Sequence, residues 1–122
     1  MQLTADDALE RKEGTTYDSF SALDVRVGKI LTANLHPKAK KPAYQLTIDF
    51  GALGVKKSSA QLTVQYQPED LIGRLVVAVV NFPPRVIGGF TSEVLVLGAV
   101  HEDGAVTLLT PERAVPLGAP IA

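Results

Sequence analysis

The sequence contains no cysteine. This absence excludes a disulfide scaffold, a thiol nucleophile and a zinc site with cysteine ligands. No apolar run approaches the roughly 20 residues that a membrane-spanning helix needs. Residues 1–14 are acidic and lack the apolar core of a signal peptide. These absences predict a soluble cytoplasmic protein without membrane insertion.

The composition is that of an ordinary globular chain. Of its 122 residues, 46% are hydrophobic and 20% are charged, which excludes wholesale disorder. A chain of this length forms one compact domain whose core needs no covalent staples.

A net charge of −1 conceals an uneven distribution. Residues 1–18 are acidic, whereas residues 36–57 carry five lysines and the single acid Asp49. The lysines are Lys38, Lys40, Lys41, Lys56 and Lys57. Such a segment either attracts phosphate or is a solvated lysine-rich loop. Lys56 and Lys57 are expected at the end of the sheet opposite Lys41, because a strand separates them.

The N-terminal residues predict a short amphipathic helix. Thr4 can cap a helix over residues 4–13, Asp7 completes a capping box, and Gly14 ends it. Residues 14–16 then form a linker. We therefore divide the chain into an N-terminal helical extension, residues 1–18, and a main domain, residues 19–122.

The main domain reads as a series of strands. In residues 42–50 the side chains of Tyr44, Leu46, Ile48 and Phe50 share one face, which predicts a half-buried strand and places Tyr44 in the core. Residues 23–31 alternate but change phase at Gly28, which predicts a bulge there. Residues 58–64 predict a weaker third strand. Residues 67–73 predict one helical turn, and residues 105–109 a last strand.

Residues 74–82 and 93–100 are nearly continuous apolar runs. Strands that are apolar on both faces need cover from the N-terminal helix, a loop or a second subunit. Because the chain has little length to spare, we predict a homodimer. The order of the elements predicts an all-β, five-stranded Greek-key OB-fold barrel, with a short helix between strands 3 and 4. Its binding face would lie between two loops, residues 36–41 and 83–92.

The strings LDVRVGKI, HPKAKKPAYQLTIDFG and RLVVAVVNFPPRVIGGFTSEVLVLGA resemble the OB-fold tRNA-binding-domain family, which also occurs as a C-terminal appendage of some methionyl-tRNA synthetases. KKSSAQLT, VNFPPR and SEVLVLG narrow the resemblance to the CsaA family of export-related chaperones. The resemblance covers residues 19–122. It implies a non-catalytic homodimer that binds unfolded or precursor polypeptides. The alternative is a structure-specific tRNA or RNA binder with little chaperone role.

Two segments depart from the tRNA-binding pattern. The usual Ser-Gln-Gly-Met string is replaced by Ser92-Glu93-Val94-Leu95, which puts an acid where phosphate is expected. The acidic residues that usually follow His-Pro are replaced by Lys38 and Lys40.

These considerations give two sets of candidate site residues. For RNA, a basic groove with hydrogen-bonding walls is expected from Lys38, Lys40, Lys41, Asn81, Arg85 and Ser92. For peptide, an apolar loop made mobile by Gly88 and Gly89 is expected from Phe82, Pro83, Pro84, Ile87 and Phe90. Alternatives remain open: Arg85 can instead form a salt bridge with Glu93, and the apolar set can instead form a dimer seam or plug the barrel.

The sequence carries no catalytic signature. His36 and His101 lie beside turn-like residues, without the spacing of a metal site or a partnered general base. Phosphate-binding loops, nucleophile elbows and dinucleotide fingerprints are also absent from the sequence. We therefore expect no catalytic residues, no metal and no cofactor.

Overall fold

The computed structural model describes residues 10–122, beginning its regular structure at α2 (Tyr17–Ser21). Residues 4–9 of the predicted N-terminal helix lie outside the described residues. Residues 10–13 are exposed and form no helix, so this part of the prediction is wrong. A charged segment of this length has no apolar face to bury, and short helices without packing are unstable in water.

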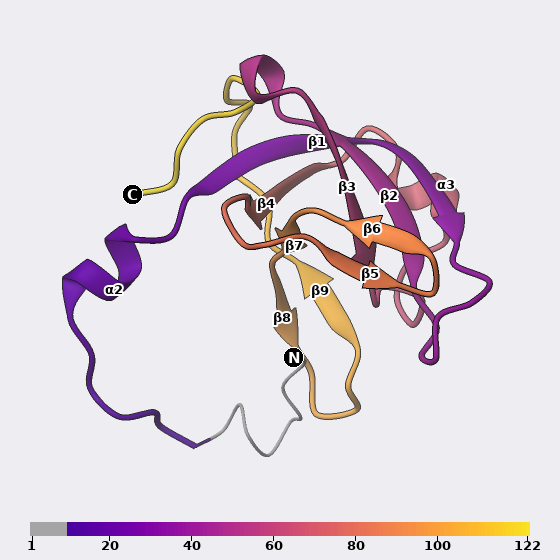
Figure 1. The fold of residues 1–122 in the computed structure, drawn as a ribbon, viewed down its shortest axis with the longest axis horizontal. Helices are drawn as coiled ribbons and strands as arrows, with labels where there is room; N and C mark the ends of the chain where they lie inside the picture. The colour runs from indigo at the N-terminus through magenta and orange to yellow at the C-terminus, as the bar shows by residue number, and fades with distance from the viewer. Residues whose placement is uncertain (1–9) are drawn as a thin grey trace.

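An antiparallel five-stranded sheet curls into a nearly closed barrel (Figure 1). Its strands are β1 (Val25–Leu35), β2 (Tyr44–Asp49), β3 (Val55–Ala60), β4 (Leu75–Val79) and β7 (Leu95–Val96). The order across the sheet is β3-β2-β1-β4-β7. Between β3 and β4 lies α3 (Pro68–Leu71), so the predicted fold and the position of its helix are confirmed.

The barrel interior is filled from one face of β2. Tyr44, Leu46, Ile48 and Phe50 are all buried, while the alternate residues are half-buried. The Tyr44 hydroxyl donates a hydrogen bond of 2.7 Å to the Tyr66 carbonyl, which satisfies its polar end. The predicted alternation is confirmed, and Tyr44 belongs to the core.

The third strand begins earlier than predicted. The 3-10 helix η1 (Gly51–Leu53) and Gly54, at φ +89°, turn the chain directly after β2. Pairing therefore starts at Val55 and ends at Ala60, which leaves residues 61–64 outside the strand. Lys56 pairs with Ile48 near the end of β2 that lies away from Lys41, as expected, whereas Lys57 pairs with Thr47 in the middle of the strand.

A bulge does interrupt β1, but not at Gly28. The register with β2 shifts between Ile30 and Thr32, whereas Gly28 pairs regularly with Val76. A Cβ at Gly28 would lie 2.6 Å from Ile48 and 2.7 Å from the Phe50 ring. Glycine is therefore needed at this position for close packing against the core. The break in the alternating sequence pattern at Gly28 marks this close contact and not a bulge.

The first half of β1 is bordered by the C-terminal segment. Val27 donates to the Ala119 carbonyl at 3.0 Å, and Ile121 donates to the Val25 carbonyl at 2.9 Å. Val25, Val27 and the paired Val79 are buried within the single chain. The chain's own C-terminal residues thus border β1, whereas Leu95 in the second apolar run remains 49% exposed.

Two hairpins complete the fold. β8 (Gly98–Val100) pairs with β9 (Val106–Leu108), and β5 (Arg85–Ile87) pairs with β6 (Phe90–Ser92). The second hairpin occupies residues that were predicted as a mobile loop. Gly88 and Gly89 have φ angles of +55° and +81°. Positive φ at both central residues gives the turn geometry that pairs the flanking strands, so the two glycines build a hairpin instead.

Candidate ligand groove and lysine loop

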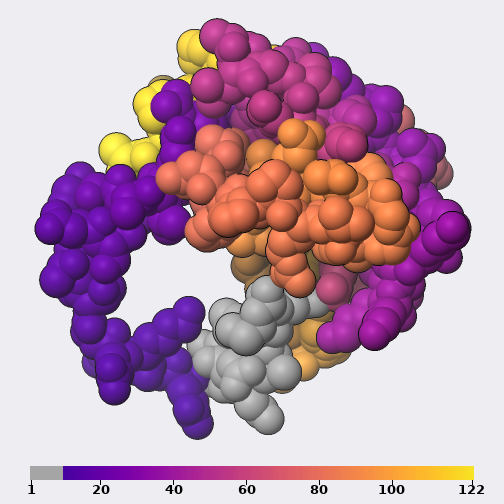
Figure 2. Space-filling model, in the orientation of Figure 1, coloured from indigo at the N-terminus to yellow at the C-terminus, as the bar shows by residue number. Residues whose placement is uncertain are grey.

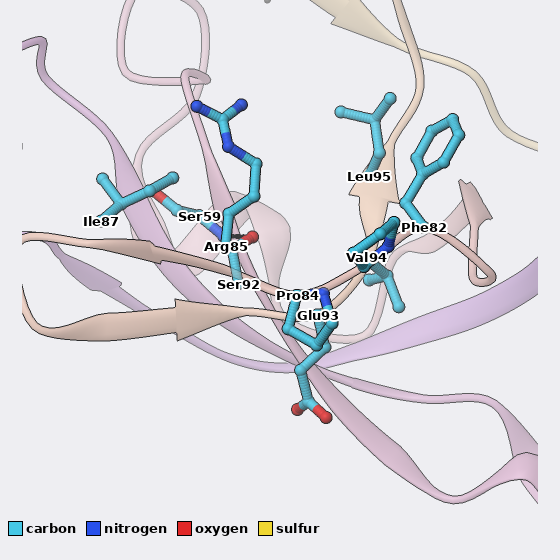
Figure 3. Close-up of a pocket in the computed structure, with 10 residues that line it drawn as sticks. Ser59, Phe82, Pro84, Arg85, Ile87, Ser92, Glu93, Val94 and Leu95 are labelled. Carbon is cyan, nitrogen blue, oxygen red and sulfur yellow. Dashed lines mark hydrogen bonds between the residues drawn. The ribbon is translucent and has the colours of Figure 1, made fainter.

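A groove with a volume of about 390 Å³ lies beside the β5–β6 hairpin (Figure 3). We call it the hairpin groove. It is lined by Ser59, Phe82, Pro83, Pro84, Arg85, Ile87, Ser92, Glu93, Val94 and Leu95. The volume falls in the range typical of ligand sites, and most of the lining side chains are apolar. Phe82 and Leu95 remain 44% and 49% exposed, so they do not plug the barrel.

The floor of the hairpin groove is fixed by hydrogen bonds between β3 and residues 92–94. The Ser59 N–H donates to the Ser92 hydroxyl oxygen at 3.0 Å, and the buried Ser58 hydroxyl donates to the Val94 carbonyl at 2.9 Å. The Glu93 N–H donates to the Lys57 carbonyl at 2.8 Å. In return, the Lys57 N–H donates to Oε1 of Glu93 at 3.1 Å. The hairpin is thereby held against the open edge of β3.

Glu93 therefore has a structural task that the sequence comparison did not reveal. Glu93 lines the hairpin groove, and its carboxylate is bound to the Lys57 N–H on β3 and not to the lysine-rich loop. The alternative that Arg85 forms a salt bridge with Glu93 is not observed. Figure 3 shows the two charged ends pointing in opposite directions. Within residues 10–122, Arg85 forms no ion pair at all.

Phe90 lies away from the hairpin groove. Its ring meets the ring of His36 edge-on at 5.6 Å between centroids, and the ammonium of Lys57 lies 5.5 Å from its centroid. His36 is buried, and its Nε2 atom has no hydrogen-bond partner among the described residues. Phe90 thus packs the hairpin onto the end of β1, and Lys57 adds a positive charge beside it.

The loop between β1 and β2 presents three exposed lysines, Lys38, Lys40 and Lys41. We call residues 38–41 the lysine loop. None of the three forms an ion pair within residues 10–122. A Cβ at Gly88 would lie 2.7 Å from the Lys38 carbonyl oxygen, so the hairpin turn touches this loop. The lysine loop and the hairpin groove are therefore separate surfaces joined by one hairpin.

Asn81 does not belong to either surface. Its Oδ1 accepts a hydrogen bond from the Asp24 N–H at 2.8 Å, and its Nδ2 donates to the Ala22 carbonyl at 2.9 Å. Both ends of the amide therefore tie the end of β4 to the chain before β1. The expectation that Asn81 offers hydrogen bonds to RNA is not supported by this geometry, because its side chain already serves the backbone.

The structure thus sorts the predicted site residues into groups. Phe82, Pro83, Pro84 and Ile87 from the peptide set line the hairpin groove, together with Arg85 and Ser92 from the RNA set. Sequence reasoning missed Ser59, Glu93, Val94 and Leu95 as lining residues. Ser59 lines the groove because β3 contacts β6, and this contact between distant segments cannot be predicted from the local sequence pattern.

Among residues 10–122, no group of three or more His, Asp or Glu side chains is placed to hold a metal ion. Within the same residues, no helix is long and apolar enough to span a membrane. His101 lies on the β8–β9 hairpin, where its Nε2 is 2.6 Å from the Thr107 hydroxyl oxygen.

A family model described as "Putative tRNA binding domain" matches residues 25–120. The chain therefore belongs to the tRNA-binding-domain family, as its sequence resemblance indicated. Methionine–tRNA ligases from Thermococcus kodakarensis and Pyrococcus abyssi are 39% and 40% identical to it, each over 92% of this chain. The chain spans only 15% and 16% of the length of these two relatives.

Among solved structures, the chain is similar to CsaA. Chaperone CsaA from Bacillus anthracis is 51% identical, with a TM-score of 0.86, over 90% of this chain and 100% of that one. CsaA chaperone protein from Picrophilus torridus is also 51% identical, with a TM-score of 0.83, over 89% and 100%. A MetRS-related protein from Pyrococcus horikoshii is 30% identical, with a TM-score of 0.81 over 91% and 100%. The resemblance to CsaA is thus confirmed.

Proposed function

We propose that this protein is a CsaA-like, non-catalytic chaperone of the cytoplasm that binds unfolded or export-bound polypeptides in the hairpin groove. The observation that carries the proposal is the groove itself, which exposes apolar side chains on a rigid floor. The similarity to CsaA along the full length of two solved chains supports it. No cofactor enters the proposal.

The groove suits weak and tolerant binding. Burying one Phe or Leu side chain contributes about 1.5–3 kcal/mol, and ordering a flexible peptide opposes part of that gain. The proline pair Pro83-Pro84 supplies one wall without an N–H donor at either position. A peptide is therefore held mainly by apolar contact, which discriminates little between sequences and suits unfolded clients.

RNA binding at the lysine loop is the second candidate function. It is favoured by the three exposed lysines that lack an ion pair within the described residues, and by membership of the tRNA-binding-domain family. Lys57 adds a further charge beside Phe90. Because Glu93 lines the hairpin groove, its negative charge disfavours phosphate binding in the groove. It does not disfavour phosphate binding at the lysine loop.

Homodimer formation, which the resemblance implies, is proposed through α2. Tyr17 and Phe20 form an aromatic pair with centroids 6.3 Å apart, and no residue of α2 is buried. Figure 2 shows this segment, in indigo, standing away from the barrel. A five-residue helix is marginal alone. We therefore propose that a second copy of the chain covers this aromatic pair.

Truncating the groove side chains should weaken peptide binding. Each of Phe82→Ala and Leu95→Ala is expected to raise the Kd about tenfold or more, because each removes apolar contact with the peptide. The measurement is fluorescence anisotropy of a labelled, capped peptide with a Leu-Phe centre. Val64→Ala is the matched control, since Val64 is exposed but does not line the groove. Wild-type affinity in both groove variants would contradict the proposed site.

Neutralising the lysine loop should reduce the salt dependence of RNA binding. For Lys38→Ala/Lys40→Ala/Lys41→Ala, the slope of log K against log salt is expected to become shallower by about 2–3, because each phosphate contact contributes about 0.7–0.9. Unfractionated tRNA is titrated at several salt concentrations. The control is Arg11→Ala/Lys12→Ala/Arg113→Ala, which removes three charges elsewhere. The assignment of RNA binding to the lysine loop would be contradicted if the slope changed equally in both variants or in neither.

Sedimentation equilibrium should report a particle of about twice 13.0 kDa at micromolar concentration. Tyr17→Ser/Phe20→Ser is expected to sediment as a monomer, because serine leaves no apolar surface on α2 for a second copy to bury. Val64→Ala is expected to remain dimeric. A monomeric wild-type protein would refute the proposed homodimer, and a dimeric double variant would refute the role of α2.

A further inference from the structure

The hairpin groove carries opposite charges that do not neutralise each other. Arg85 and Glu93 both line it, yet they form no salt bridge and point in opposite directions (Figure 3). Lys57 contacts Glu93 through its backbone N–H, but its ammonium group lies over the Phe90 ring and does not pair with the Glu93 carboxylate. Neither charge is neutralised by the other, although Oε1 of Glu93 already accepts the Lys57 N–H.

Glu93 is the better fixed of the two. Its backbone N–H is bound to the Lys57 carbonyl, and its Oε1 accepts the Lys57 N–H. These two bonds hold a half-buried carboxylate at the groove. Arg85 is exposed on β5 and presents a guanidinium, which can bind a carboxylate through two parallel hydrogen bonds. One end of the groove thus attracts a cation and the other an anion.

We propose that the hairpin groove prefers peptide segments whose apolar centre is flanked by a basic residue on one side and an acidic residue on the other. The basic residue meets Glu93, the acidic residue meets Arg85, and the apolar centre lies against Phe82 and Leu95. This inference rests on the proposed function, since it assigns the ligand chemistry of the same groove. Charge complementarity at the two ends distinguishes such a segment from a purely apolar one.

The size of the preference follows from the exposure of the charges. Pairs of exposed charges change an equilibrium by about two- to fivefold each at low ionic strength. A matched segment should therefore bind several-fold more tightly than a neutral one. Because the charges are near the surface, the preference should fade as added salt shortens the range of the electrostatic interaction.

The test uses capped peptides of one length with the same Leu-Phe centre and different flanking residues. The flanks are Lys and Glu in both orders, Lys on both sides, Glu on both sides, and Gln on both sides. Anisotropy at low salt should give the tightest binding for a mixed peptide, by about two- to fivefold over either like-charged peptide. The ranking should flatten at high salt.

Two variants identify the charges responsible. Glu93→Gln keeps an oxygen acceptor for the Lys57 N–H but removes the charge, so the peptide with two Glu flanks should equal or exceed the mixed one. Arg85→Gln should favour the peptide with two Lys flanks in the same way. Misfolding is distinguished by the Gln-flanked peptide, because loss of the groove would weaken its binding by the same factor as that of the charged peptides.

The outcomes separate this inference from the function on which it rests. If all wild-type affinities agree while Phe82→Ala still weakens binding, charge selection is overturned and the peptide site stands. If the ranking persists in both Gln variants, other charges cause it and the inference is likewise overturned. If no peptide binds the wild-type protein, the proposed function and the inference fail together.

Discussion

The barrel closes where the edge of β3 meets residues 92–94, and the rest of the architecture depends on that seam. The two segments are held by side-chain and isolated backbone hydrogen bonds rather than by a regular ladder. Ser58 is buried at the seam, and its hydroxyl binds the Val94 carbonyl. An unpaired polar group at such a place would be costly, so these bonds fix the position of the hairpin strongly.

One hairpin consequently separates two chemically different surfaces. On one side lies the mostly apolar hairpin groove, and at the hairpin turn lies the lysine loop, close to Gly88. His36 and Phe90 pack the hairpin against the barrel between them. This arrangement explains how a member of the tRNA-binding-domain family can present a mostly apolar groove together with a basic loop.

Features governed by local pattern were predictable from the sequence. The alternation of apolar and polar residues that ends at Phe50 correctly predicts which face of β2 is buried, and the residues around Pro68 predict α3. Contacts between distant segments were not predictable. The partners of Asn81 lie 57 and 59 residues away in sequence, so its bracing role has no local signal. The same holds for residues 118–121, whose hydrogen bonds to the first half of β1 join segments more than 90 residues apart.

The most direct test of the account is to map the peptide on the protein by amide chemical shifts during titration with a Leu-Phe peptide. The largest changes are expected at Ser59, at Phe82 and at residues 85–87 and 92–95, which form the groove and its seam. Changes at residues 38–41 should be small. Perturbations confined to the lysine loop or to the β8–β9 hairpin would contradict the claim that closing the barrel at this seam creates the peptide site.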